Sequence, residues 1–243
     1  RDPGFLDAVL GWVGNPAATP LGLSVLQATV EEFSGCSGHG TVVQARRDQL
    51  KRLLTDALAR LCAALLSVLG ACSGGGAAAD AVAVQALNVL AQLVSWAPMA
   101  DHLTPPLVTC LLEVVARGLA PHAPPSAVLA SVASMQTLTE VICKRLVPPA
   151  YASFVMDVGG QVLAGLQSVV ERLTTLDANL RGSFLGFVGA FFRVHLARLE
   201  SAPGFPMAGL LDVWLKHTLA QPDLDGFLGC LEVWASIVEH AVE

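Results

Sequence analysis

The sequence predicts an all-α protein. Apolar residues recur every three or four positions in most segments, the period of one face of an α-helix, and no segment keeps the alternation of a strand. The apolar stripes come in pairs separated by short turns, and the first stripe of each pair begins near residues 17, 81, 126, 177 and 222. HEAT and armadillo repeats have a comparable length of about 40–47 residues. Residues 1–243 are therefore expected to form about five antiparallel helix pairs, stacked as a right-handed superhelical solenoid of the HEAT type.

Apolar spacing and boundary residues predict the elements of the N-terminal part. The first helix is expected over 5–13, before Asn15 and Pro16, and the second over 20–33. A Gly/Ser-rich loop over 34–40 precedes a capping box at 41–44, which predicts one long helix to about Leu69. The small residues of 73–79 predict a linker.

The same signals predict the elements of the C-terminal part. Helices are expected over 81–96, 104–117, 126–146, 151–174 and 177–199, with Gly118 as a C-cap and Asp177 as an N-cap. Two more follow, from Pro206 and Pro222 onward, and their stripes predict an antiparallel hairpin. The first helix presents Phe5 and Trp12, and the last presents Phe227, Trp234 and Val238, without an obvious polar cap, so these end faces are expected to be uncovered.

Bulk properties narrow the class of protein. The uncharged stretch 81–100 is long enough to span a membrane, but its Gln, Asn and Ala content favours a buried helix over a membrane span. The net charge of −6 argues against a nucleic-acid groove. The six cysteines form no C-x-x-C pair, which predicts free thiols in a reducing compartment. The chain starts in mid-pattern at Arg1 without a secretory leader, so a fragment of a longer protein is expected.

Residue types that carry chemistry are present without the patterns that catalysis or metal binding needs. Cys36 and His39 could supply two zinc ligands, but a closed site needs four and no second pair is near. No phosphate-binding loop or nucleophile elbow occurs, so neither a cofactor nor an enzyme is expected. His195, His217 and His240 lack a visible acid partner and are interpreted as packing or surface residues, and Trp96, Trp214 and Trp234 as core residues.

The best candidate for partner binding is a basic cluster in the predicted helix 44–69. It consists of Arg46, Arg47, Lys51 and Arg52. One interpretation is a solvated helix face, supported by Asp48 four residues before Arg52. The other is a contact with an acidic protein partner.

Five segments resemble, in the same order, helices of the exportins, which belong to the importin-β (karyopherin) superfamily. They are TPLGLSVLQATVEEF at 19–33, ARRDQLKRLLTDAL at 45–58, ALNVLAQLVSWAP at 86–98, FFRVHLARLE at 191–200 and FLGCLEVWASIVEH at 227–240. Within the exportins, the chain most resembles the subfamily that exports actin with profilin. It departs from that subfamily at 73–79, which is short where those proteins carry a long polar insertion.

The resemblance implies a segment of the early-to-middle repeats of a nuclear export receptor. Such receptors bind Ran-GTP and cargo together on the concave face of a HEAT solenoid, pass nucleoporins, and shuttle between nucleus and cytoplasm. The second helices of the pairs line that face, so the basic cluster, Glu113, Arg117, Asp212 and Lys216 would be presented there. A HEAT scaffold or adaptor without Ran dependence is the alternative.

Overall fold

The chain folds into helices joined by turns, and the computed structural model describes residues 4–34, 44–97, 104–143 and 152–242. Those residues include no strand, so the predicted all-α class is confirmed. The elements are α1 (Phe5–Val13), α2 (Thr19–Ser34), α3 (Gln44–Asp56), α4 (Leu58–Ala71), α5 (Ala77–Trp96), α6 (Pro105–Leu119), α7 (Pro125–Leu138), the π-helical turn η1 (Thr139–Cys143), α8 (Ala152–Val169), the 3-10 turn η3 (Val170–Arg172), α9 (Ala178–Ser201), α10 (Met207–Leu219) and α11 (Leu224–Val242).

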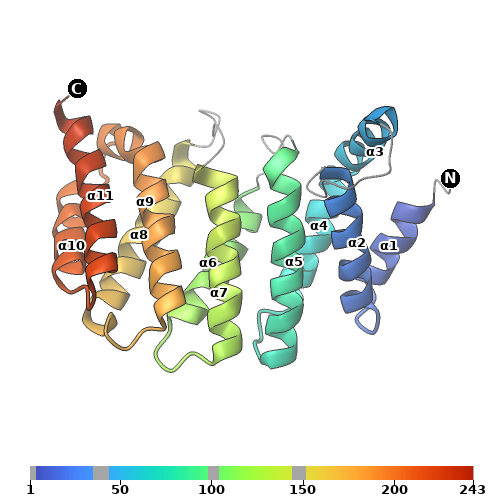
Figure 1. Cartoon of the computed structure of the whole chain (residues 1–243), viewed down its shortest axis with the longest axis horizontal. Coiled ribbons are helices and arrows are strands. Elements are labelled where there is room, and N and C mark those ends of the chain that lie inside the picture. The colour runs from blue at the N-terminus through green and yellow to red at the C-terminus, as the bar shows by residue number, and fades with distance from the viewer. Residues whose placement is uncertain (1–3, 35–43, 98–103, 144–151, 243) are drawn as a thin grey trace. The chain divides into compact units, whose positions relative to one another are not determined.

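Residues 1–110 form the first of two compact units. In it α2 lies beside α5 and α1 beside α4, and these two layers pack face to face (Figure 1). Leucines at steps of three and four supply most of the core between the layers, including Leu23, Leu26, Leu61, Leu65 and Leu90. Helix α3 packs against α2 and α4.

Residues 111–243 form the second unit, in which the same layering recurs. Helices α7, α9 and α11 lie side by side in one layer, and α8 and α10 in the other. Helix α9 is buried along most of its circumference because it touches α7, α8 and α11. Its Phe191 and Phe192 and the Trp214 side chain of α10 are among the largest fully buried side chains of the protein.

Glycine at a helix crossing determines how closely two helices approach. Gly118 was expected to end its helix as a C-cap, but α6 continues to Leu119 and Gly118 does not have a positive φ. A Cβ atom at Gly118 would lie 2.2 Å from Ser131 Cβ and 2.9 Å from the Ala127 carbonyl oxygen. The close contact of α6 with α7 therefore requires a glycine at position 118, whereas the backbone conformation there would allow other residues.

Several predicted boundaries are wrong. The long helix expected to Leu69 breaks at Ala57, and α5 begins at Ala77, inside the predicted linker. The helix expected over 126–146 changes to a π-helical turn at Thr139, and the one expected to residue 174 ends in the 3-10 turn η3. Gly75 and Gly76 supply the positive φ values, 75° and 105°, that let the chain turn immediately before α5.

The predicted N-cap of α9 is confirmed. One carboxylate oxygen of Asp177 accepts hydrogen bonds from the backbone N–H groups of Asn179 and Leu180, at 2.9 and 3.1 Å. A side chain of this kind satisfies amide donors that have no partner within the first helical turn. The α8–α9 connection is thereby fixed at the point where it borders a hollow of unit 2 that is described below.

Candidate partner-binding surfaces

Helix α3 carries the basic cluster that the sequence predicts to bind a partner. The backbones of Arg46 and Arg47 belong to α3, but their side chains lie outside the described residues. Arg52 is exposed, whereas Lys51 is half-buried, with Nζ 5.9 Å from the centre of the Trp96 ring. An ammonium over an indole face is stabilised by about 0.5–1 kcal/mol at a partly exposed site. Lys51 thus helps to hold α3 against the end of α5, a structural role that the sequence did not reveal.

A polar network joins α2 to α5 one turn before Trp96. Glu31 accepts hydrogen bonds from the amide groups of Gln92 and Gln27, both at 2.9 Å. These bonds favour the ionised carboxylate, so they lower the pKa of Glu31 below its usual value, and the bond from Gln92 has the larger effect. The ionised Glu31 carboxylate and the Lys51 ammonium therefore contact α5 at positions one turn apart, near its C-terminal end. This surface is polar and charged rather than catalytic.

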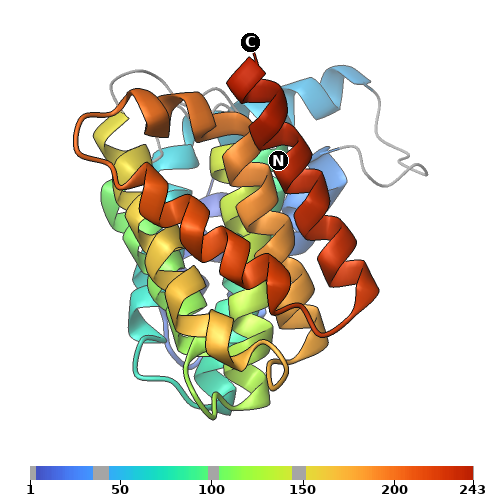
Figure 2. The same ribbon diagram turned by 90° about the vertical axis from the view of Figure 1, so that its left-hand side faces the viewer.

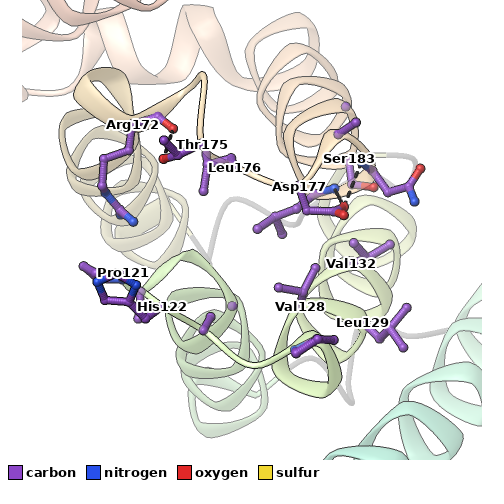
Figure 3. Close-up of a pocket in the computed structure, with 18 of the residues that line it drawn as sticks. Pro121, His122, Val128, Leu129, Val132, Arg172, Thr175, Leu176, Asp177 and Ser183 are labelled. Atoms are coloured by element: carbon purple, nitrogen blue, oxygen red, sulfur yellow. Dashed lines mark hydrogen bonds between the residues drawn. The ribbon is translucent and has the colours of Figure 1, made fainter.

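A hollow in unit 2 lies between the α6–α7 turn and the α8–α9 turn, with an open volume of about 1140 Å³ (Figure 3). Pro121 and His122 line one side, and Val128, Leu129 and Val132 of α7 line another. Leu129 is 63% exposed. His122 has a φ of 59°, the left-handed region that a non-glycine residue adopts only in tight turns.

Both charged side chains on the far side of this hollow are engaged in holding the fold. Arg172 donates from Nη2 to the Leu119 carbonyl oxygen at 2.7 Å and from Nε to that of Ser168 at 3.1 Å. Asp177 is the N-cap of α9. The two groups do not face each other as an acid–base pair, so the hollow offers shape and apolar surface rather than reactive groups.

A second hollow of about 520 Å³ continues the first along α7, η1 and α9. The two share Gln136 and Ser183 in their linings. Between α7 and α9 the floor is open because Gly182 and Gly186 carry no side chain and a Cβ atom there would meet nothing within 4 Å. Together the two hollows form the α7–α9 groove, bordered by Leu129 at one end and Val194 at the other. A long groove with small residues on its floor is a shape suited to a polypeptide segment.

Comparison with known families decides what kind of molecule carries these surfaces. The model of the exportin 1-like protein family matches residues 3–128, just over half of the chain. The chain belongs to the exportin 1-like family. The resemblance noted in the sequence is therefore confirmed by an independent comparison.

Curated relatives place this exportin-family chain near exportin-6. It is 25% identical to exportin-6-A of Xenopus laevis, and the match covers 97% of this chain and 27% of that protein. Exportin-6 of Danio rerio and of Homo sapiens match with the same identity and the same coverage. The chain thus spans about a quarter of the length of the curated relatives it matches.

One buried constellation in this exportin-family chain has the residue types of a cysteine nucleophile and its base. His217 of α10 and Cys230 of α11 lie with Nδ1 and Sγ 3.7 Å apart. Burial lowers the pKa of His217 to about 4 and raises that of the Cys230 thiol to about 11. Both groups are therefore neutral at physiological pH, and neither is open to solvent. The pair packs the α10–α11 hairpin and lacks the thiolate that nucleophilic catalysis needs.

His195 and His240, the other two histidines interpreted above as packing or surface residues, also hold helices together. His195 is buried and its Nε2–H donates to the Ile142 carbonyl oxygen at 3.1 Å, which joins α9 to η1. Burial lowers the pKa of His195, so the ring is neutral. His240 contacts Glu200 at 2.7 Å, an acid partner that the sequence did not reveal because forty residues separate the two.

The predicted tryptophans and charged residues fall in different environments. Trp214 is fully buried, as predicted, and stacks on the His217 ring at 5.0 Å, whereas Trp96 and Trp234 are half-buried. Asp212 and Lys216 form an exposed ion pair at 2.7 Å on α10. Glu113 is exposed and Arg117 half-buried on α6. Exposed pairs of this kind contribute little to stability.

The remaining predictions concern metals, thiols and membranes. In the described part of the chain no cluster of three or more His, Cys, Asp or Glu could hold a metal ion, and Cys36 and His39 lie outside it. Cys62, Cys72, Cys110, Cys143 and Cys230 are free of disulfides. Helix α5 and the α7–η1 segment are long and apolar enough to cross a membrane. Both bury apolar residues within the helical layers, as core helices of a non-membrane protein also do.

Proposed function

We propose that this exportin-family chain is a segment of a nuclear export receptor that binds Ran-GTP and a protein cargo. By resemblance the cargo is actin with profilin, and the receptor passes nucleoporins and shuttles between nucleus and cytoplasm. The observation that carries the proposal is the family match together with similarity to exportin-6 over 97% of the chain. The segment acts by binding proteins, without catalysis, a cofactor or a metal.

The charge distribution supports protein recognition through α3. The chain has 14 Lys and Arg residues and a net charge of −6, yet four of its basic residues fall within positions 46–52. A local basic patch on an otherwise acidic protein attracts the acidic face of a partner. We assign this contact to Arg46, Arg47 and Arg52, with Lys51 at its edge. Because Lys51 already contacts Trp96, its share is smaller than the sequence implies.

The α7–α9 groove supports the same kind of function by different means. Protein interfaces combine an apolar centre with a polar border. The exposed Leu129 and Val194, with Gln136 and Arg193 beside them, fit that composition. The groove and α3 would give the receptor two protein-binding surfaces of different chemistry.

Charge reversal on α3 tests the proposal. The variant Arg47→Glu/Arg52→Glu avoids Lys51, since reversal there would also release α3 from Trp96. Each lost peripheral charge costs about 1 kcal/mol or less, so the pair should weaken binding by about fivefold to thirtyfold. The assay is capture of purified Ran, loaded with GTP or GDP, and of actin–profilin, on the immobilised chain and on the full-length receptor that contains it.

A control with the same change in net charge separates a local contact from a general effect. Arg60→Glu/Ser24→Asp/Asn88→Asp makes the same change in net charge at exposed side chains outside α3 and outside the residues expected to face a partner. We expect the control to bind like the wild type, the α3 variant to bind less, and Ran-GTP to be preferred over Ran-GDP. Unchanged binding in the α3 variant would show that the basic cluster is a solvated helix face without a partner. Equal cargo binding with either nucleotide state would favour the scaffold without Ran dependence.

A further inference from the structure

The α7–α9 groove contains polar side chains that the fold does not use. It follows two helices of the α7, α9 and α11 layer of unit 2, which Figure 2 shows from the side of α10 and α11. Gln136 and Ser183 line both hollows, so they lie where the hollows meet. Neither side chain makes a hydrogen bond within the part of the chain that the structure describes. An amide and a hydroxyl each offer a donor and an acceptor, so the middle of the groove can bind a peptide backbone.

The second hollow is bordered by a cation, Arg193 of α9, which is exposed. Among the described residues no hydrogen bond or ion pair engages its guanidinium, although Glu140 lines the same hollow. Burial raises the pKa of the Cys143 thiol in this hollow to about 12, and the charge of Arg193 acts against that rise. Arg193 therefore lies close to a neutral thiol that cannot balance its charge. A cation at the edge of an apolar groove favours a carboxylate on the bound molecule.

The first hollow, between the α6–α7 and α8–α9 turns, supplies apolar contact. Val128, Leu129 and Val132 of α7 lie along it, and Leu176 of the α8–α9 turn lies across from them (Figure 3). The charged side chains of this hollow are already bound to backbone groups of the fold, as described above. This end of the groove therefore favours an uncharged apolar side chain.

The length of the groove determines the spacing of these two groups in a ligand. Gly182 lines the first hollow and Arg193 the second, eleven residues further along α9. Eleven helical residues rise by about 16 Å. An extended chain covers about 3.3 Å per residue, so about five residues bridge the same length. An apolar side chain and a carboxylate about five positions apart would therefore reach the two ends of the groove together.

An extended segment matches the groove better than a helix does. A helix satisfies its own backbone groups and would leave Gln136 and Ser183 without backbone partners. An extended segment exposes N–H and C=O groups that need such partners. A Cβ atom at Gly182 or Gly186 would meet no atom within 4 Å, so the floor between these positions is open to a backbone.

We propose that the α7–α9 groove binds an extended segment of a partner protein that carries an apolar residue and, about five positions away, an aspartate or glutamate. The apolar residue occupies the first hollow, and Arg193 pairs with the carboxylate. Gln136 and Ser183 hydrogen-bond the backbone between them. This inference rests on the proposed function as a protein-binding segment and names the ligand chemistry of one of its surfaces.

Short synthetic peptides test the chemistry of the ligand. Each holds one leucine and one charged residue about five positions apart, separated by serine and threonine, and is made in both sequence orders with capped ends. Fluorescence anisotropy with the 243-residue chain should show the better aspartate peptide binding about fivefold more tightly than its lysine counterpart. Salt should reduce that preference because the ion pair is exposed. Equal affinity for the aspartate and lysine peptides would overturn the charge selection.

A helical form of the aspartate peptide, cross-linked between side chains, tests the extended conformation. It should bind more weakly than the linear peptide, because its backbone groups are satisfied internally and cannot pair with Gln136 and Ser183. Tighter binding by the cross-linked helix would overturn the extended mode.

Variants of the groove locate the site. Gly186→Leu places a side chain on the open floor and should abolish binding of the aspartate peptide. Gly160→Leu is the matched control, at another exposed glycine with open space around it on α8, and should bind normally. Both variants should keep the helical circular dichroism, since leucine is a good helix former. Arg193→Glu should reverse the preference in favour of the lysine peptide. Unchanged binding by Gly186→Leu, or an unchanged preference in Arg193→Glu, would refute the site.

The peptide assay contains neither Ran nor cargo, so it separates this inference from the proposed function. If the peptides fail to bind while Ran-GTP and cargo are still captured, the groove assignment alone is wrong. If the peptides bind as expected while capture is independent of Ran, the groove assignment holds and the export proposal is wrong.

Discussion

Replacing Gly118 with alanine should destabilise unit 2 strongly, although alanine is the better helix former. The new Cβ would lie 2.2 Å from Ser131 Cβ, whereas carbon atoms pack at about 3.5–4.0 Å. Helices α6 and α7 would therefore have to separate by more than 1 Å at this point (~1.5 Å). Overpacking of this kind costs about 1–3 kcal/mol.

The separation would also stretch two buried hydrogen bonds. Ser131 Oγ donates to the Val115 carbonyl oxygen at 3.0 Å, and Ser134 Oγ to that of Leu111 at 2.7 Å. Each contributes about 1 kcal/mol. The gain in helix propensity offsets up to about 1 kcal/mol, so the free energy of unfolding should fall by about 2–4 kcal/mol. In a domain of this size the midpoint of thermal unfolding should fall by about 5–15 °C.

Gly186→Ala is the matched control, since no atom lies within 4 Å of a Cβ placed there in the middle of α9. It should raise the midpoint by about 2–4 °C through helix propensity alone. Thermal and urea unfolding followed by circular dichroism measure both variants. If Gly118→Ala proved as stable as Gly186→Ala, the close contact of α6 with α7 would be wrong.

Three smaller predictions concern single interactions. Lys51→Met should lower the free energy of unfolding of unit 1 by about 0.5–1 kcal/mol, because it removes the contact with Trp96. Arg52→Met should change that free energy by less than about 0.5 kcal/mol. Equal losses for the two variants in urea unfolding would exclude the contact. Asp177→Ala should cost about 1 kcal/mol through loss of the α9 N-cap, and a stability equal to that of the wild type would argue against the cap. Burial lowers the pKa of His217 to about 4, so the folded protein resists protonation of this ring. The free energy of unfolding should therefore be highest above about pH 6.5 and fall by up to about 3 kcal/mol as the pH drops to 4. His217→Gln should flatten that pH dependence, and an unchanged slope would contradict a buried neutral ring.

Helix existence was predictable because apolar periodicity is a local signal, but helix ends were not. The leucines at 54, 58, 61 and 65 keep steps of three and four across the break at Ala57. The pattern therefore contains no sign that α3 and α4 are separate helices. Gly118 followed the usual rule for a C-cap, yet the contact with Ser131 determines its role, and that contact depends on how two helices cross.

The candidate sites were predictable only in part, because side chains find partners far away in the sequence. The basic cluster was visible as composition, but the Trp96 ring beneath Lys51 comes from another helix pair. His217 and Cys230 meet across a hairpin turn, and His240 meets Glu200 across forty residues. The α7–α9 groove depends on turns whose positions no local pattern specifies. Exposed apolar residues at the terminal helices were predicted correctly for Phe5, Trp12 and Val238, whereas Phe227 and Trp234 are half-buried.

The most direct test of the export proposal is the coupling between Ran and cargo on the full-length receptor that contains this segment. Titration calorimetry would measure the affinity for actin–profilin alone, with Ran-GTP and with Ran-GDP. Two ligands that favour the same state of a deformable stack raise each other's affinity, typically by about 5–150-fold. We predict such an increase with Ran-GTP and none with Ran-GDP. The same cargo affinity under all three conditions would contradict the account.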